Sequence, residues 1–87
     1  MEFISESGRI YAENDNGEVV AEITYTVNDG IATINHTFTD DSLRGQWIAG
    51  KLVQTAAEQI IKNGYKLRAT CSYAVSWLNK HPEYKQR

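Results

Sequence analysis

Three side chains in this sequence have the chemistry to attack a carbonyl carbon or to move a proton: Cys71, His36 and His81. The thiolate is the nucleophilic form of cysteine, and Cys71 stands just before a helix-forming segment, whose N-terminus favours a negative charge. The other reading is that Cys71 is a small buried hydrophobic residue. His36 is a candidate general base, because histidine has the side-chain pKa nearest neutrality. It also fits a hydrogen-bonded packing residue on a strand, between Ile34 and Phe38.

A fourth feature, the segment from Asp40 to Ala49, could bind an anion. It lies between a predicted strand and a predicted long helix, where backbone N–H groups lack partners and the helix dipole favours negative charge. A pyrophosphate fits these properties. The alternative is an ordinary loop followed by a helix start.

Two turn signals divide the first half of the chain into strands that would position these residues. Asp15-Asn16-Gly17 and Asn28-Asp29-Gly30 tolerate positive φ between stretches of strand-like composition. In the third strand we expect Ile34, His36 and Phe38 to share one face, because side chains alternate along a strand. The predicted strands are Phe3 to Glu13, Glu18 to Val27, and Ile31 to Thr39.

From Gly45 the hydrophobic residues recur at helical spacing, and Asn63-Gly64 is a typical stop for this long helix. A short strand, Tyr65 to Thr70, follows. Ser72 can cap a second helix, which runs to about Asn79, ahead of Pro82. The order of three antiparallel strands, helix, strand and helix predicts an α+β fold with a mixed, mostly antiparallel sheet.

Several of these segments together resemble the GNAT acetyltransferase superfamily. Leu43-Arg44-Gly45-Gln46, followed after one residue by Ile48-Ala49, is similar to the acetyl-CoA loop of that group. Cys71-Ser72-Tyr73, with Trp77-Leu78 and the segment from Lys80 to Tyr84, resembles the C-terminal signature of its short stand-alone members. The strand end from Ile34 to Thr37 is similar as well. The resemblance implies one GNAT-like acetyltransferase domain over residues 1–87, with a GNAT-like fold.

The resemblance also implies a cofactor, acetyl-CoA or coenzyme A, and places it. The pantetheine arm would run beside the third and fourth predicted strands, Cys71 would lie near the thioester, and His81 would lie near the cofactor. From its own position before Pro82, His81 is expected to cap helix carbonyls or to close the turn. The backbone amides implied to hold the pyrophosphate belong to Arg44, Gly45, Gln46, Trp47, Ile48 and Ala49.

The implied reaction is acetyl transfer from acetyl-CoA to an amine, on a small molecule or a protein, that the sequence does not identify. The amine attacks the thioester directly, or Cys71 first accepts the acetyl group. Trp47 departs from the family pattern, which has a second glycine at that place. Its indole would block the cofactor, pack beside it, or turn away into a hydrophobic contact. The rival hypothesis is therefore a non-catalytic CoA-binding or protein-interaction module.

The amino-acid composition narrows the kinds of protein and partner that remain. The 87 residues, 41% hydrophobic and 23% charged, are typical of one globular domain. A net charge of -2 argues against nucleic acid and membrane as partners. The single cysteine has no partner for a disulfide and no ligand set for zinc. The N-terminal residues lack the pattern of a secretory signal, so we expect a cytoplasmic protein.

Overall fold

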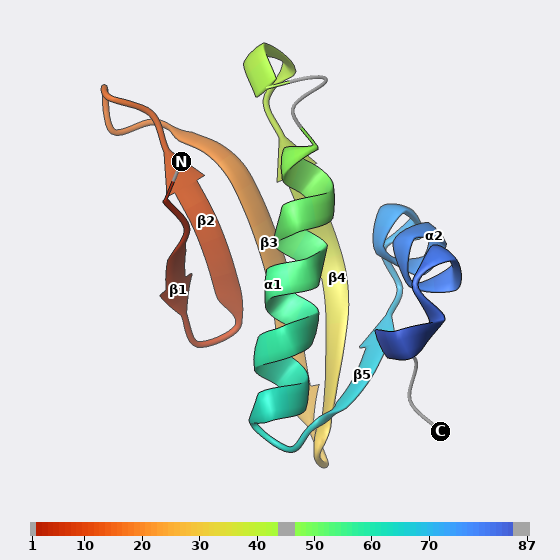
Figure 1. The fold of residues 1–87 in the computed structure, drawn as a ribbon. Coiled ribbons are helices and arrows are strands. Elements are labelled where there is room, and N and C mark those ends of the chain that lie inside the picture. Colours follow the sequence, from red (N-terminus) through yellow and green to blue (C-terminus); the bar gives the residue numbers. More distant parts are fainter. Residues whose placement is uncertain (1, 44–46, 85–87) are drawn as a thin grey trace.

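The computed structural model describes residues 2–43 and 47–84. Five strands form one sheet in the order β1-β2-β3-β4-β5 (Figure 1), antiparallel at each junction except the parallel pair β4 and β5. This confirms the predicted α+β fold with a mixed, mostly antiparallel sheet. The elements are β1 (Ile4–Glu6), β2 (Arg9–Glu13), β3 (Val19–Asn28), β4 (Ile31–Thr39), α1 (Ile48–Lys62), β5 (Lys66–Ala69) and α2 (Ser72–Lys80), with short 3-10 turns at Asp41–Leu43 and Pro82–Tyr84.

The first predicted strand was wrong, because a turn divides it into β1 and β2. Gly8 lies in this turn with φ 78°, a conformation that only glycine adopts without strain. Its carbonyl accepts a hydrogen bond from the N–H of Tyr25 at 2.9 Å. A Cβ at Gly8 would lie 2.8 Å from the carbonyl oxygen of Tyr25. The turn therefore depends on β3, which lies far from it in the sequence.

The two predicted hairpin turns are confirmed. Asp29 and Gly30 both have positive φ, 53° and 77°. This is expected for a two-residue hairpin turn, whose backbone twist matches the right-handed twist of the flanking strands. In the other turn the side-chain oxygen of Asn14 accepts hydrogen bonds from the N–H groups of Asn16 and Glu18, at 2.9 and 3.0 Å. These local contacts explain why the turns were visible in the sequence.

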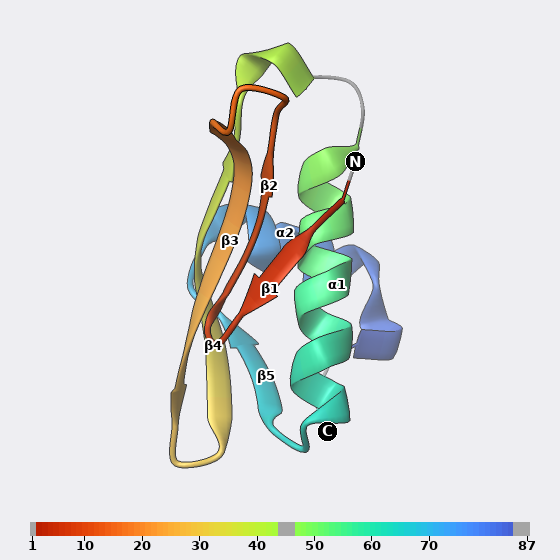
Figure 2. The same ribbon diagram turned by 90° about the vertical axis from the view of Figure 1, so that its left-hand side faces the viewer.

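The helix α1 packs its hydrophobic side on one face of the sheet (Figure 2). It ends as predicted: the N–H groups of Gly64 and Tyr65 donate to the carbonyls of Ile61 and Ile60, and Gly64 has φ 84°. Its start was predicted at Gly45, which lies outside the described residues. The largest fully buried side chains are Ile10, Ile23, Ile34, Leu52, Val53 and Ile60.

A β-bulge in β4 changes which residues share a face. Thr24 pairs with His36, but the next residue of β3, Tyr25, pairs with Ile34, so Asn35 is the extra residue. His36 and Phe38 share a face as predicted, but the placement of Ile34 on that face was wrong. Ile34 is fully buried, whereas His36 and Phe38 are exposed.

The strands β4 and β5 separate at this bulge. Their last paired residues are Ile34 and Ala69, and the carbonyl of Ile34 then accepts from the N–H groups of Thr70 and Cys71, at 2.9 and 3.3 Å. The chain then enters α2, which lies beyond the β5 side of the sheet (Figure 1). Ser72 is the first residue of α2 and Cys71 is its N-cap, so the predicted cap at Ser72 was wrong by one residue.

The turn at Gly8 yields a stability prediction with a matched control. Gly8→Ala should destabilise the protein by about 2–4 kcal/mol, because left-handed alanine costs roughly 1–2 kcal/mol and the close contact with Tyr25 adds a similar amount. Gly17→Ala, with φ 80° and nothing within 4 Å of the added Cβ, should cost only the backbone part. Urea denaturation measures both; equal losses would contradict the role of the Tyr25 contact.

Candidate active site

The first backbone N–H groups of α1 have no acceptor within the helix. The first hydrogen bond within the helix runs from the N–H of Lys51 to the carbonyl of Trp47, at 3.1 Å. The N–H groups of Ile48, Ala49 and Gly50 precede it and have no partner inside the helix. Within residues 47–62, Trp47 makes no side-chain capping bond. Three predicted cofactor residues, Arg44, Gly45 and Gln46, lie outside the described residues.

A cavity of about 300 Å³ lies beside this helix start. Two carboxylates line it together with the helix residues. The hydroxyl and the N–H of Ser42 donate to Asp40 and lower the pKa of its carboxyl, the N–H lying 3.0 Å away. Asp40 is therefore ionised at neutral pH, and its charge disfavours an anion on its own side of the cavity. The lining residues are Thr39, Asp40, Asp41, Leu43, Trp47, Ile48 and Ala49.

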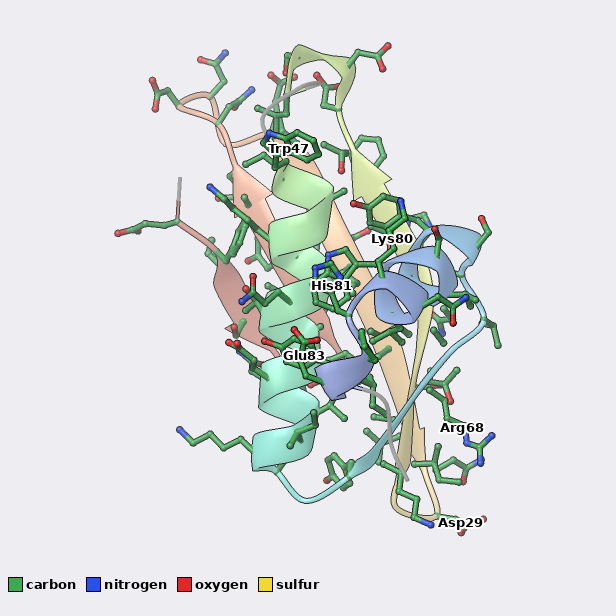
Figure 3. All side chains as sticks on the ribbon, turned by 45° about the vertical axis from the view of Figure 1, so that its right-hand side comes forward. Asp29, Trp47, Arg68, Lys80, His81 and Glu83 are labelled. Carbon is green, nitrogen blue, oxygen red and sulfur yellow. The ribbon has the colours of Figure 1, made fainter. Side chains whose placement is uncertain are left out.

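The backbone of Trp47 explains why the family pattern has glycine at this position. Trp47 has φ 61° and ψ 22°, in the left-handed region that bulky residues rarely adopt. Its side chain is 83% exposed. Of the three orientations expected from the sequence, burial in a hydrophobic contact is therefore wrong, because the indole is mostly exposed at the N-terminal end of α1 (Figure 3).

The structure places Cys71 against β4, at the start of α2. Its Sγ lies 3.4 Å from Oγ1 of Thr37, and the residue is partly buried. Burial acts to raise the pKa of the thiol, but hydrogen bonds from the Thr37 hydroxyl and the N–H groups of Ala74 and Tyr73 outweigh it. The pKa of Cys71 is thereby lowered, so the thiolate is favoured.

The structure does not bring His36 together with Cys71. Thr37 pairs with the fully buried Ile23 and so lies on the core face of the sheet, whereas His36 lies on the opposite face. The His36 side chain is 55% exposed, and its Nε2 is 3.9 Å from Oε1 of Glu22. A base at this position is open to solvent.

The predicted capping role of His81 is confirmed. Its Nδ1 lies 2.9 Å from the carbonyl oxygen of Trp77. A carbonyl only accepts, so Nδ1 carries the proton. The imidazole also stacks on the Trp77 ring, with 3.9 Å between centroids and 15° between planes. Tyr84 packs on the same indole and donates to Glu58 at 2.8 Å, which holds the C-terminal turn on α1.

A groove of about 390 Å³ separates α1 from α2. Gly50 keeps the two helices close, because a Cβ there would lie 3.3 Å from Nε1 of Trp77. Most of the lining residues were not predicted, although the spacing of Trp77 and His81, four residues apart on a helix, could have suggested their stacking. The groove is lined by Trp47, Gly50, Lys51, Gln54, Tyr73, Trp77, Lys80 and His81.

Comparison with known proteins identifies the family. The sequence matches the family described as GCN5-related N-acetyl-transferase over residues 9–87. The NMR structure of a GCN5-like protein from Staphylococcus aureus is 33% identical, with a TM-score of 0.77 over 95% of this chain and 82% of that one. The chain therefore belongs to the GCN5-related N-acetyltransferase family, GNAT.

More distant structures share the fold alone. A GCN5-related N-acetyltransferase from Sphaerobacter thermophilus is 21% identical, with a TM-score of 0.64 over 70% of this chain. A GNAT family N-acetyltransferase from Escherichia coli, solved in complex with CoA, is 19% identical, with a TM-score of 0.62 over 70% of this chain. This chain spans only 20% and 38% of these two proteins. No curated protein matches the sequence.

The described residues contain neither a cluster suited to a metal ion nor a helix suited to span a membrane. In residues 2–43 and 47–84, no group of three or more His, Cys, Asp and Glu residues is placed to hold a metal ion. In the same part of the chain, neither helix has the length and apolar character needed to cross a membrane.

The surroundings of Cys71 predict its reactivity. Because its pKa is lowered, the alkylation rate with iodoacetamide should reach half its maximum at a lower pH than that of a free thiol. Thr37→Val removes a hydrogen bond to the thiolate, so it should raise this pH and slow alkylation at pH 7 about two- to fivefold. Thr37→Ser keeps the hydroxyl and should behave as the parent; an unchanged rate in Thr37→Val would refute the contact.

Proposed function

We propose that this chain binds acetyl-CoA along β4 and transfers the acetyl group to an amine. The observation that carries the proposal is the separation of β4 from β5 after Ile34, beside a cysteine whose thiolate is favoured. Beyond Ile34, β4 has no strand pairing on its β5 side within the described residues. An extended ligand with amide groups, such as the pantetheine arm, suits such an edge. Family membership and the CoA complex of the E. coli relative support the choice of ligand.

In this proposal the start of α1 holds the pyrophosphate. The N–H groups of Ile48 and Ala49 have no partner within the helix, and the helix dipole adds attraction for an anion. The N–H of Trp47 belongs to the same set. Arg44, Gly45 and Gln46 are included on the sequence resemblance, and His81 is included because it lines the groove beside α1.

Two routes lead from bound acetyl-CoA to product. In one, the neutral amine attacks the thioester carbonyl, the carbon–sulfur bond breaks, and CoA leaves as a thiol after taking up the proton that the amine loses. In the other, the Cys71 thiolate attacks first and displaces the CoA thiolate. The amine then attacks the acetyl-cysteine, which yields the amide and returns Cys71. The lowered pKa of Cys71 favours the second route.

Fewer observations bear on the acceptor amine than on the cofactor. His36 is kept as the base in this scheme; because it lies on the face of the sheet opposite Cys71, it would take the proton of the acceptor before the amine reaches the thioester beside Cys71. The nearby carboxylate of Glu22 is already paired with Arg9, so it adds little free charge to attract a protonated amine, which must lose its proton to His36. The acceptor amine, on a small molecule or a protein, is not assigned. A cytoplasmic location, and the absence of nucleic acid and membrane partners, remain predictions from the sequence.

Thermal unfolding with acetyl-CoA tests the binding step. Saturation at about 100 times the dissociation constant should stabilise the protein by about 2.7 kcal/mol and raise its melting temperature. Desulfo-CoA, which lacks the reactive thioester, should stabilise it as well. An unchanged melting temperature at millimolar acetyl-CoA would reject the proposed enzymatic function. It would favour a protein-interaction module whose cofactor loop no longer binds CoA.

Intact-mass measurement separates the two routes. After incubation with acetyl-CoA and no acceptor, the covalent route predicts protein that carries one acetyl group, and Cys71→Ser should carry none. Cys71→Ser should still bind acetyl-CoA, because the thiol is not among the proposed cofactor contacts. Acetyl transfer that survives in Cys71→Ser at the parent rate would establish direct attack instead.

A further inference from the structure

The exposed ring of Trp47 is not accounted for by folding. Its left-handed backbone is unfavourable for a bulky residue, and its side chain is 83% exposed, the highest exposure among the large hydrophobic residues described. Glycine at this position would remove the backbone strain and the exposed apolar surface together. Neither packing nor local conformation therefore favours tryptophan here. A contact between the indole and a ligand would favour tryptophan at this position.

Trp47 lines both cavities at the end of α1. One is the cavity beside the helix start, and the other is the groove between α1 and α2. Figure 3 shows Trp47 at one end of α1 and His81 farther along, between α1 and α2. A ligand that passes from the helix start into the groove must pass the indole.

The charges of the groove select the kind of ligand. Lys51 and Lys80 line it, and no carboxylate is among its described lining residues. The groove therefore disfavours a protonated amine and favours an anion. Tyr73 and Trp77 give it aromatic walls, but Trp77 already stacks on His81. Tyr73 is 42% exposed, whereas Trp47 is 83% exposed, so of the described aromatic residues that line the groove Trp47 offers the most open surface to a second planar group.

We infer that Trp47 is a stacking platform for the adenine of CoA, with the adenosine 3′-phosphate held by Lys51 and Lys80 and the 5′-phosphate, as part of the pyrophosphate, left at the start of α1. This inference rests on the proposed function, because it assigns one end of the ligand proposed above. Adenosine 3′,5′-bisphosphate combines a planar ring with negative charge, which is the chemistry of this groove. Stacking of a base on an aromatic side chain strengthens binding about 5- to 100-fold.

The test compares three ligands on variants of Trp47 by calorimetry. Trp47→Gly should weaken binding of CoA and of adenosine 3′,5′-bisphosphate about 5- to 100-fold, and should change binding of 4′-phosphopantetheine, which lacks adenine, less than about threefold. Trp47→Phe keeps an aromatic face and should retain most of the affinity. Trp47→Gly should unfold at the same or a higher temperature than the parent, because it relieves the left-handed strain, so lost affinity would not reflect lost folding.

The outcomes separate this inference from the proposed function. If the parent binds CoA and Trp47→Gly binds it equally or more tightly, the stacking role is overturned and the proposed function stands. Equal losses for 4′-phosphopantetheine and adenosine 3′,5′-bisphosphate would also overturn it, since adenine would then not be the contact. If the parent protein binds none of the three ligands, both fail. Lys51→Gln with Lys80→Gln should weaken CoA binding and reduce its dependence on salt; an unchanged affinity would overturn the phosphate assignment.

Discussion

The extra residue in β4 is the constraint on which the proposed site depends. Asn35 is not paired with any residue in the register of β3 and β4, so every side chain after it faces the side opposite to the one that strict alternation would give. Thr37 consequently faces the core side, where its hydroxyl contacts Cys71, and His36 faces away. The pairing with β5 ends at Ile34, next to the bulge, which leaves the rest of β4 without a strand on that side in the described chain.

The thiolate of Cys71 is favoured by local donors, not by the charge of the whole protein. The net charge is -2, which gives no general attraction for an anion. The Thr37 hydroxyl and the first N–H groups of α2 instead lie where the sulfur charge develops, and they outweigh the effect of burial on the pKa. The same kind of donor, the first N–H groups of α1, is the basis for placing the pyrophosphate. Both proposals therefore use backbone donors at a helix N-terminus.

Trp47 is a place where local preference and the observed structure disagree. Such disagreements are expected at functional sites, where a residue is retained for its contacts with a ligand. The indole adds apolar surface to the cavity beside the start of α1. It also brings a planar surface to the groove between α1 and α2, which two lysines line as well.

The sequence by itself determined the local elements: the turn at Asp29 and Gly30, the stop at Gly64, the α1 period and, through motif resemblance, the family. Each of these signals lies within a few residues of the element it specifies, so local chemistry is sufficient. Only the tertiary structure decided the turn at Gly8, which depends on Tyr25, and the contact between Thr37 and Cys71, which are 34 residues apart. The bulge at Asn35 likewise depends on the register of β3 against β4. Periodicity within one segment carries no information about a partner strand, and for that physical reason the faces of β4 and the environment of the thiol could not be predicted.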